Sequence, residues 1–125
     1  CGTDICSVNR MKESIEKLGN KLINRIFTKA EIQYCEARKA SKYESYAARF
    51  AAKEAVSKAL GSGFSQGITL KDIEILHDNL GCPQVTLYKN ALSRAYFISK
   101  NQQFRMHLTL SNEREYVNAV AVLEC

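Results

Sequence analysis

The sequence lacks the features of a membrane-spanning or exported chain. It has no run of about eighteen apolar residues, and no positively charged segment followed by an apolar one at its beginning. We therefore expect no membrane partner, no membrane-spanning helix and no signal peptide. Because the chain opens directly on the strand-like residues 1–7, we also expect a few residues to precede it in the natural protein.

Clustered metal-ligating residues of the zinc type are also lacking. The five cysteines are scattered without a C-x-x-C motif, and His77 and His107 are the two histidines that could complete a zinc site. We expect free thiols in a reducing cytoplasm, and histidines that are hydrogen-bonded or at the surface. The cysteines are Cys1, Cys6, Cys35, Cys82 and Cys125.

Acidic residues are in deficit. Eighteen Lys and Arg against thirteen Asp and Glu leave a net charge of +5, with the clearest local excess in residues 10–25. A basic helix suits an acidic or phosphate-bearing partner and raises the encounter rate more than it fixes affinity. A solvated helix face without a partner is the commoner alternative. The basic residues here are Arg10, Lys12, Lys17, Lys21 and Arg25, against Glu13 and Glu16.

The first half of the chain carries helix signals. Residues 8–27 are amphipathic, with a break or kink expected at Gly19. Thr28 and Glu31 form a capping box, which predicts a new helix running to about Ala40. A polar joint over residues 41–44 then precedes a third helix.

The second half changes to an alternating pattern with a period of two. We expect two antiparallel hairpins separated by a short helix. At 125 residues the sequence predicts one α+β domain, residues 1–125, with helices packed on one face of an antiparallel sheet. The expected elements are strands at 72–76 and 84–88 around a turn at 78–81, a helix at 90–100, and strands at 106–111 and 116–123 around a turn at 112–115.

The third helix includes residues 49–59, R-F-A-A-K-E-A-V-S-K-A, and its end is marked by Gly61. Phe50, Glu54 and Lys58 share one face, where a carboxylate and an ammonium could lie at the lip of a pocket. The alternative is an ordinary surface pair, worth about 0.3 to 0.5 kcal/mol. A second face would let another element approach closely, because it consists of the small residues Ala48, Ala52, Ala55 and Ala59.

A glycine-rich loop follows this helix. Three glycines in residues 61–67 allow the backbone to approach a ligand closely. Their spacing matches neither a Walker A motif nor a dinucleotide fingerprint, so the loop alone assigns no ligand.

Four motifs taken together resemble the bacterial holo-acyl-carrier-protein synthases. They are G-T-D-I at 2–5, R-F-A-A-K-E-A-V-S-K-A at 49–59, D-I-E-I with G-x-P at 72–83, and L-T-L-S followed by E-Y-V-N-A-V-A-V at 108–122. The resemblance is collinear over nearly the whole chain. It implies a homotrimeric 4′-phosphopantetheinyl transferase with interfacial active sites, which moves the phosphopantetheine arm of coenzyme A onto a serine of apo acyl carrier protein and releases adenosine 3′,5′-bisphosphate.

The resemblance also implies roles for three residues. Asp4 and Glu54 correspond to the family's metal ligands, and Lys58 to the lysine that meets the coenzyme A phosphates. Mg²⁺ fits this pair, since it binds through one or two carboxylates plus substrate phosphates and water. Phosphoryl transfer needs alignment and charge stabilisation, which Mg²⁺ and Lys58 would supply. A base must take the serine proton; Glu54, through a water at the metal, is a candidate that the sequence does not identify further.

Other positions carry over from the family more loosely. Arg49 and Lys53 would reach phosphate or a neighbouring subunit. The basic helix would dock the acidic carrier protein through Arg10, Lys17, Lys21 and Arg25. The nucleotide pocket would be shaped or contacted by Gly61, Gly63, Pro83, Ser111 and Asn112.

Two positions depart from the family pattern. Asn112 stands where histidine is frequent, and Cys82 where lysine is frequent, both at expected nucleotide contacts. Two other classes therefore remain open: an inactive homologue, and a non-catalytic basic α+β module that binds RNA. The module does not explain the matching carboxylates, and no RNP-like aromatic strand or G-x-x-G clamp is present, so we expect an enzyme without a nucleic-acid partner.

Overall fold

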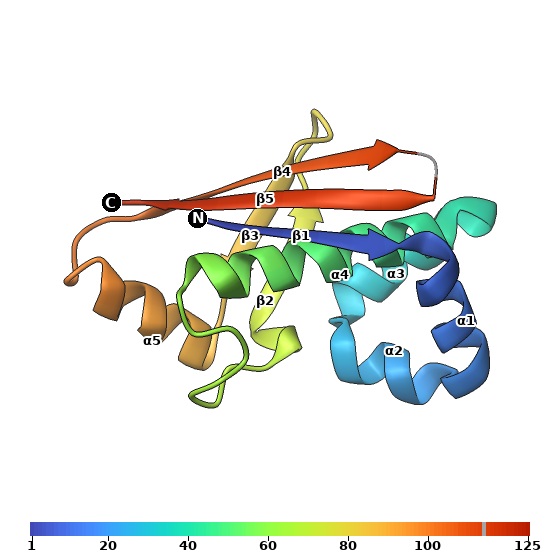
Figure 1. Cartoon of the computed structure of the whole chain (residues 1–125), viewed down its shortest axis with the longest axis horizontal. Coiled ribbons are helices and arrows are strands. Elements are labelled where there is room, and N and C mark those ends of the chain that lie inside the picture. Colours follow the sequence, from blue (N-terminus) through green and yellow to red (C-terminus); the bar gives the residue numbers. More distant parts are fainter. Residues whose placement is uncertain (114) are drawn as a thin grey trace.

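The computed structural model describes residues 1–113 and 115–125. Figure 1 shows helices on one side of a long antiparallel sheet, with the two chain ends side by side at one end of it. The strands are β1 (Gly2–Ser7), β2 (Ile73–His77), β3 (Pro83–Leu87), β4 (Arg105–Glu113) and β5 (Tyr116–Glu124). The helices are α1 (Val8–Leu18), α2 (Asn20–Ile26), α3 (Lys29–Ala37), α4 (Lys42–Ala59) and α5 (Lys89–Ile98), with 3₁₀ turns at Lys39–Ser41 and Leu70–Asp72.

Helix α4 is the centre of the domain. It contacts β1 and β5 on one side, and α1, α3 and β2 on its other sides (Figure 1). Eleven of its residues are buried, including the charged residues Arg49 and Lys53. The predicted close approach at its small face is confirmed, because β1 crosses over Ala55 and Ala59.

The strands form two antiparallel sheets. One has the order β1-β5-β4, and the other is the β2-β3 hairpin. Partners on neighbouring strands share a face, so the inner face of the larger sheet carries Asp4 with Ala119 against α4, while Val120 faces outward. The predicted hairpins and α+β class are confirmed.

Element boundaries differ from the prediction at several places. Helix α4 begins at Lys42, so residues 42–44 belong to the helix, since Tyr46 anchors its first turns against Phe27 with ring centroids 4.8 Å apart. Helix α3 ends at Ala37 rather than near Ala40, because Lys39 has a positive φ of 53°.

The break at Gly19, whose φ is 64°, and the capping box of Thr28 and Glu31 are confirmed. In the turn predicted over 112–115, residue 114 lies outside the described residues, while β4 already includes 112 and 113. None of the helices described has both the length and the apolar character that a membrane span requires.

Candidate active site

Gly2 allows β1 to lie directly on α4. A Cβ at this position would be 2.1 Å from the Ala55 carbonyl oxygen and 2.7 Å from the Ala59 nitrogen, so no other residue fits without a shift of the backbone. Two residues later, Asp4 points to the same inner face of the sheet. The strand therefore brings the Asp4 carboxylate to the C-terminal half of α4.

Asp4, Glu54 and Lys58 meet at this crossing. The Lys58 Nζ donates to the Thr3 carbonyl oxygen at 2.9 Å and to Asp4 Oδ1 at 3.2 Å. Burial raises the pKa of Glu54, and the negative charge of Asp4 raises it further, whereas Lys58 lowers it. Lys58 pairs with Asp4. This differs from the alternative that we considered, an ordinary surface pair between Lys58 and Glu54.

The donor set at the crossing fits Mg²⁺ better than zinc. Two carboxylates from separate elements face one lysine, which leaves one negative charge uncompensated, and Mg²⁺ binds through one or two carboxylates completed by water and substrate oxygens. Over residues 1–113 and 115–125, no group of three or more His, Cys, Asp and Glu side chains could hold a metal ion. All five cysteines are free thiols.

A second candidate centre is a pocket of about 400 Å³ at the N-terminal half of α4. Its lining combines two arginines with an aromatic ring, an imidazole and an amide. Of the predicted residues it contains Arg49, Pro83 and Asn112. The other lining residues are Tyr34, Arg38, Glu44, Ser45, Ala48, His77, Gly81 and Leu110.

Arg49 is the buried cation of this pocket, with 1% of its surface exposed. Its Nη2 lies 2.9 Å from His77 Nδ1, and its Nη1 reaches the Ser45 carbonyl oxygen at 3.5 Å. Its Nε is buried without a hydrogen-bond partner among the described residues. Asn112, which departs from the family pattern, is held in place by a hydrogen bond: its Nδ2 donates to Glu44 Oε1 at 2.8 Å.

The two centres lie on different faces of α4. An α-helix turns by about 100° per residue, so Glu54 is rotated by about 140° from Arg49, and Lys58 by about 180°. None of Asp4, Glu54 and Lys58 lines the Arg49 pocket. Within one chain, the carboxylate centre and the arginine pocket are therefore separate.

Comparison with known proteins identifies the family. Residues 1–121 match the model of the 4′-phosphopantetheinyl transferase superfamily. The chain belongs to this superfamily. It is 48% identical to the holo-[acyl-carrier-protein] synthase of Ruminiclostridium cellulolyticum, over 98% of this chain and 89% of that protein.

Solved structures of this superfamily share the fold. The crystal structure of the holo-[acyl-carrier-protein] synthase of Neisseria meningitidis matches with a TM-score of 0.84 and 35% identity, over 99% of this chain and 96% of that one. The Helicobacter pylori enzyme, solved in complex with coenzyme A, matches with a TM-score of 0.82 and 29% identity, over 98% of each chain. The predicted resemblance is confirmed, and the chain is an enzyme of the holo-acyl-carrier-protein synthase class.

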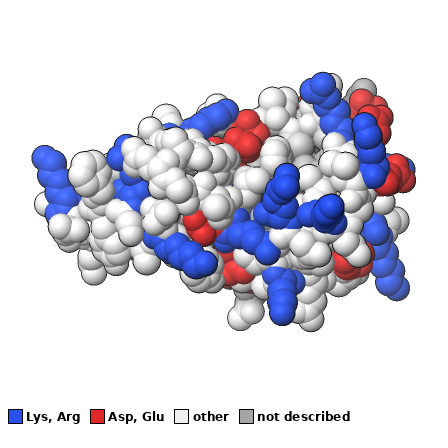
Figure 2. Space-filling model, turned by 90° about the horizontal axis from the view of Figure 1, so that it is seen from below, with Lys and Arg blue, Asp and Glu red and all other residues white. Residues whose placement is uncertain are grey.

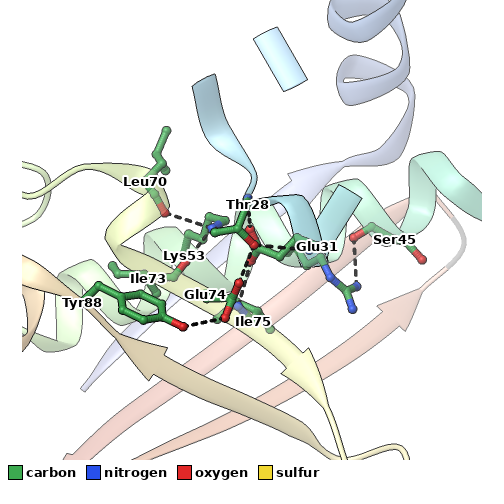
Figure 3. Close-up of polar contacts among 10 residues, drawn as sticks. Thr28, Glu31, Ser45, Lys53, Leu70, Ile73, Glu74, Ile75 and Tyr88 are labelled. Atoms are coloured by element: carbon green, nitrogen blue, oxygen red, sulfur yellow. Dashed lines mark hydrogen bonds and ion pairs between the residues drawn. The ribbon is translucent and has the colours of Figure 1, made fainter. Parts of the chain in front are cut away.

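The structure does not place Lys53 where phosphate could reach it. Its ammonium is fully buried, 2.8 Å from Glu31 Oε1, and it donates to the carbonyl oxygens of Leu70 and Ile73 (Figure 3). Burial lowers the pKa of Lys53, and the Glu31 carboxylate opposes this effect. The contact expected for Lys53, with phosphate or with a neighbouring subunit, therefore stays a prediction that the geometry of this chain does not support, because the lysine lies in the core beside Glu31.

The remaining predicted residues fall at several places. Gly61 and Gly63 follow the C-terminal end of α4, where their N–H groups bond to the carbonyl oxygens of Lys58 and Ser57 at 2.9 and 3.1 Å. Ser111 lies on the outer face of the sheet, whereas Asn112 lies on the inner face, toward the pocket. Ser111 therefore does not join Asn112 in this pocket.

Sequence analysis missed Tyr34, Arg38 and His77 in the pocket. Tyr34 lies on α3, Arg38 caps the C-terminus of that helix and His77 lies on β2, far along the chain, so no spacing motif contains all of them. The spacing of Tyr34 and Arg38, four residues apart and thus on one helix face, was the only available signal.

Four predicted docking residues lie on the exposed surfaces of α1 and α2. They are Arg10, Lys17, Lys21 and Arg25. Figure 2 shows one face of the molecule, where most charged side chains are Lys or Arg. Beside Arg10 lies an apolar depression of about 410 Å³, lined by residues such as Met11, Leu22 and Phe50.

Proposed function

We propose that this enzyme transfers the 4′-phosphopantetheine group of coenzyme A to a serine of apo acyl carrier protein and releases adenosine 3′,5′-bisphosphate. The observation that carries the proposal is the meeting of Asp4, Glu54 and Lys58 where β1 crosses α4. Its relatives are named holo-[acyl-carrier-protein] synthases, and that of Helicobacter pylori was solved in complex with coenzyme A. The five free cysteines suit the reducing cytoplasm, where we place the reaction.

The chemistry at the crossing follows from these charges. Asp4 and Glu54 would hold Mg²⁺, which when bound supplies positive charge to the pyrophosphate of coenzyme A. Lys58 would turn from Asp4 to a phosphate oxygen and stabilise charge on the leaving group. The serine oxygen forms a bond to the β-phosphorus as the bond to the oxygen shared with the α-phosphate breaks. The serine proton passes to a base, for which Glu54 is the candidate.

The nucleotide half of coenzyme A would bind in the Arg49 pocket of a neighbouring subunit. The two centres face different directions on α4, so joining them requires a second copy of the chain. The outer sheet face suits such an interface, because Val120 and Val122 are each 42% exposed and Ile5 is 58% exposed. We therefore propose a homotrimer with active sites between subunits.

The acidic carrier protein would dock on the basic surface of α1 and α2. Arg10 borders the apolar depression, so one site offers both a charge contact and apolar area. The depression also includes Cys6, two residues from Asp4 along β1, so a carrier protein docked there would lie next to the carboxylate centre.

The test is the intact mass of an apo acyl carrier protein after incubation with this protein, coenzyme A and Mg²⁺, with EDTA as the control. We expect a gain of one phosphopantetheine group that EDTA prevents. No gain with several carrier proteins, by a folded sample, would favour an inactive homologue or a binding module.

Asp4→Asn and Glu54→Gln test the two carboxylates. Both variants should keep the thermal unfolding temperature and lose nearly all turnover, because each removes one of the two charges that hold the metal. A loss in rate smaller than about tenfold, or about 1.4 kcal/mol of transition-state stabilisation, would refute the ligand role.

A further inference from the structure

Three side chains of the Arg49 pocket form a stack that the transfer chemistry does not use. The Tyr34 ring lies nearly parallel to the His77 imidazole, with centroids 5.1 Å apart and an interplanar angle of 15°. The Arg49 guanidinium lies over the same tyrosine ring, 4.1 Å from its centroid. The Arg38 guanidinium is 5.8 Å from that centroid, so the Tyr34 ring has two cations beside it, Arg38 and Arg49.

The hydrogen bond between Arg49 and His77 fixes the protonation state of the imidazole. Arg49 Nη2 lies 2.9 Å from His77 Nδ1, and a guanidinium has only donors. Nδ1 must therefore accept, which places the single ring proton on Nε2. Burial lowers the pKa of His77, and the positive charges of Arg49 and Arg38 lower it further, against a smaller opposing effect of Asp78.

The acidic groups near the pocket are occupied by other partners. Glu44 accepts from Asn112 Nδ2 at 2.8 Å. Asp78 Oδ1 accepts from the backbone N–H groups of Leu80 and Cys82, each at 2.9 Å. Arg49, by contrast, keeps a buried Nε with no partner among the residues described. The pocket therefore has unused donors for an anion.

We infer that His77 is a positioning residue for Arg49 and that it couples the binding of a phosphate monoester in this pocket to the uptake of one proton. Neutral His77 holds the guanidinium as an acceptor. When phosphate oxygens accept from Arg49 instead, Nδ1 is released, and the nearby negative charge favours its protonation. The imidazolium then donates from both ring nitrogens.

The direction of the pH dependence follows from reciprocity. If the anion favours protonated His77, the proton favours the anion to the same extent, so affinity rises as pH falls toward the ordinary histidine range near about 6.5. The groups that face His77 are Arg49 on α4, Tyr34 on α3, Arg38 at the C-terminal cap of α3, and Asp78 beyond β2. The inference rests on the proposed function only for the ligand, the nucleotide phosphate of coenzyme A.

The experiment is calorimetric titration of the protein with adenosine 3′,5′-bisphosphate, in two buffers of equal pH and different ionisation enthalpy. His77→Gln keeps an acceptor for Arg49 and cannot be protonated. Wild type should take up more protons per ligand than His77→Gln, by up to about one, and its affinity should rise by up to about tenfold more per unit of falling pH. His107, the other histidine of the sequence, is present in both proteins, so its protonation cancels from the comparison.

A second measurement needs no variant. The His77 ring signals of the wild-type protein, titrated by NMR, should give a higher pKa with ligand than without it. An unchanged His77 pKa, equal proton uptake in wild type and His77→Gln, or no binding by a protein that still transfers the group, would each overturn the inference. Proton-coupled binding that depends on His77, in a protein without transferase activity, would support the inference and refute the proposed function.

Discussion

Gly2 sets how near Asp4 comes to Glu54 and Lys58. The backbone of β1 lies so close to α4 that a Cβ at residue 2 would be 2.1 Å from the Ala55 carbonyl oxygen. The strand and the helix therefore form one rigid unit that holds the carboxylates together without a bond between them. Gly2 thus affects the carboxylate centre only by setting how close β1 lies to α4.

Gly2→Ala should move β1 away from α4 and separate the carboxylates. We expect the free energy of unfolding to fall by about 1 to 3 kcal/mol, as for overpacked sites. Turnover should fall by a larger fraction of its wild-type value than the free energy of unfolding does. Gln102→Ala is the control, because the Gln102 side chain is exposed in the connection between α5 and β4. Urea unfolding and the carrier-protein mass assay measure the two effects. Gly2→Ala with the stability and rate of wild type would contradict this account.

At the scale of elements, α4 is held by a buried polar network. Lys53 on α4 pairs with Glu31 on α3, and Glu31 also accepts from the backbone N–H groups of Thr28 and Ile75, both at 2.8 Å. Glu74 on β2 accepts from Thr28 Oγ1 at 2.6 Å and from the Tyr88 hydroxyl at 2.9 Å (Figure 3). The network ties α3, α4 and β2 in one relative position.

Lys53→Met should destabilise the domain by about 3 to 5 kcal/mol, because it leaves the buried Glu31 carboxylate without its counterion. Lys58→Met is the matched control at the same helix. The Lys58 side chain is half exposed, so losing its pair with Asp4 should cost about 0 to 1 kcal/mol. Urea unfolding of both variants compares them. Equal stability of the two variants would show that the Lys53 pair does not hold the fold.

Local signals in the sequence were sufficient for most elements. Gly19 and the capping box of Thr28 have short-range causes, so these boundaries were predicted correctly. The burial of Lys53 could not be predicted, because it depends on an ion pair in the folded core with Glu31, which lies twenty-two residues earlier in the chain. Asp4, Glu54 and Lys58 were singled out from motifs, whereas Tyr34 and His77 meet Arg49 only through the packing of α3 and β2 against α4.

At the scale of the whole molecule, the uneven charge should govern encounter with the carrier protein. Arg10→Glu should raise the KM for carrier protein with little change in kcat, because it reverses a charge on the docking surface. The wild-type KM should rise as salt increases from about 0.01 to 0.15 M, where the Debye length falls from about 30 to 8 Å. Lys100→Glu, an exposed change after α5, is the charge-matched control. A KM that does not respond to salt would refute electrostatic docking.

The outer sheet face should be the subunit interface. Val120→Glu places a charge on this face, so it should dissociate the trimer and abolish turnover while the monomer stays folded. Sedimentation gives the mass of the assembly, and circular dichroism the fold. Gln102→Glu, at an exposed position before β4, is the control. A monomeric wild type with full activity would refute the interfacial site.

The separation of the two centres on α4 has a genetic consequence. An allele that damages Glu54 leaves the Arg49 pocket of its product intact, and an allele that damages Arg49 leaves the carboxylates intact. If the proposed trimer with sites between subunits forms, mixed trimers in a cell that expresses both alleles should reconstitute about a quarter of the sites at random assembly. Two alleles that change opposite faces of α4 should therefore complement each other. Two alleles that change the same face should not.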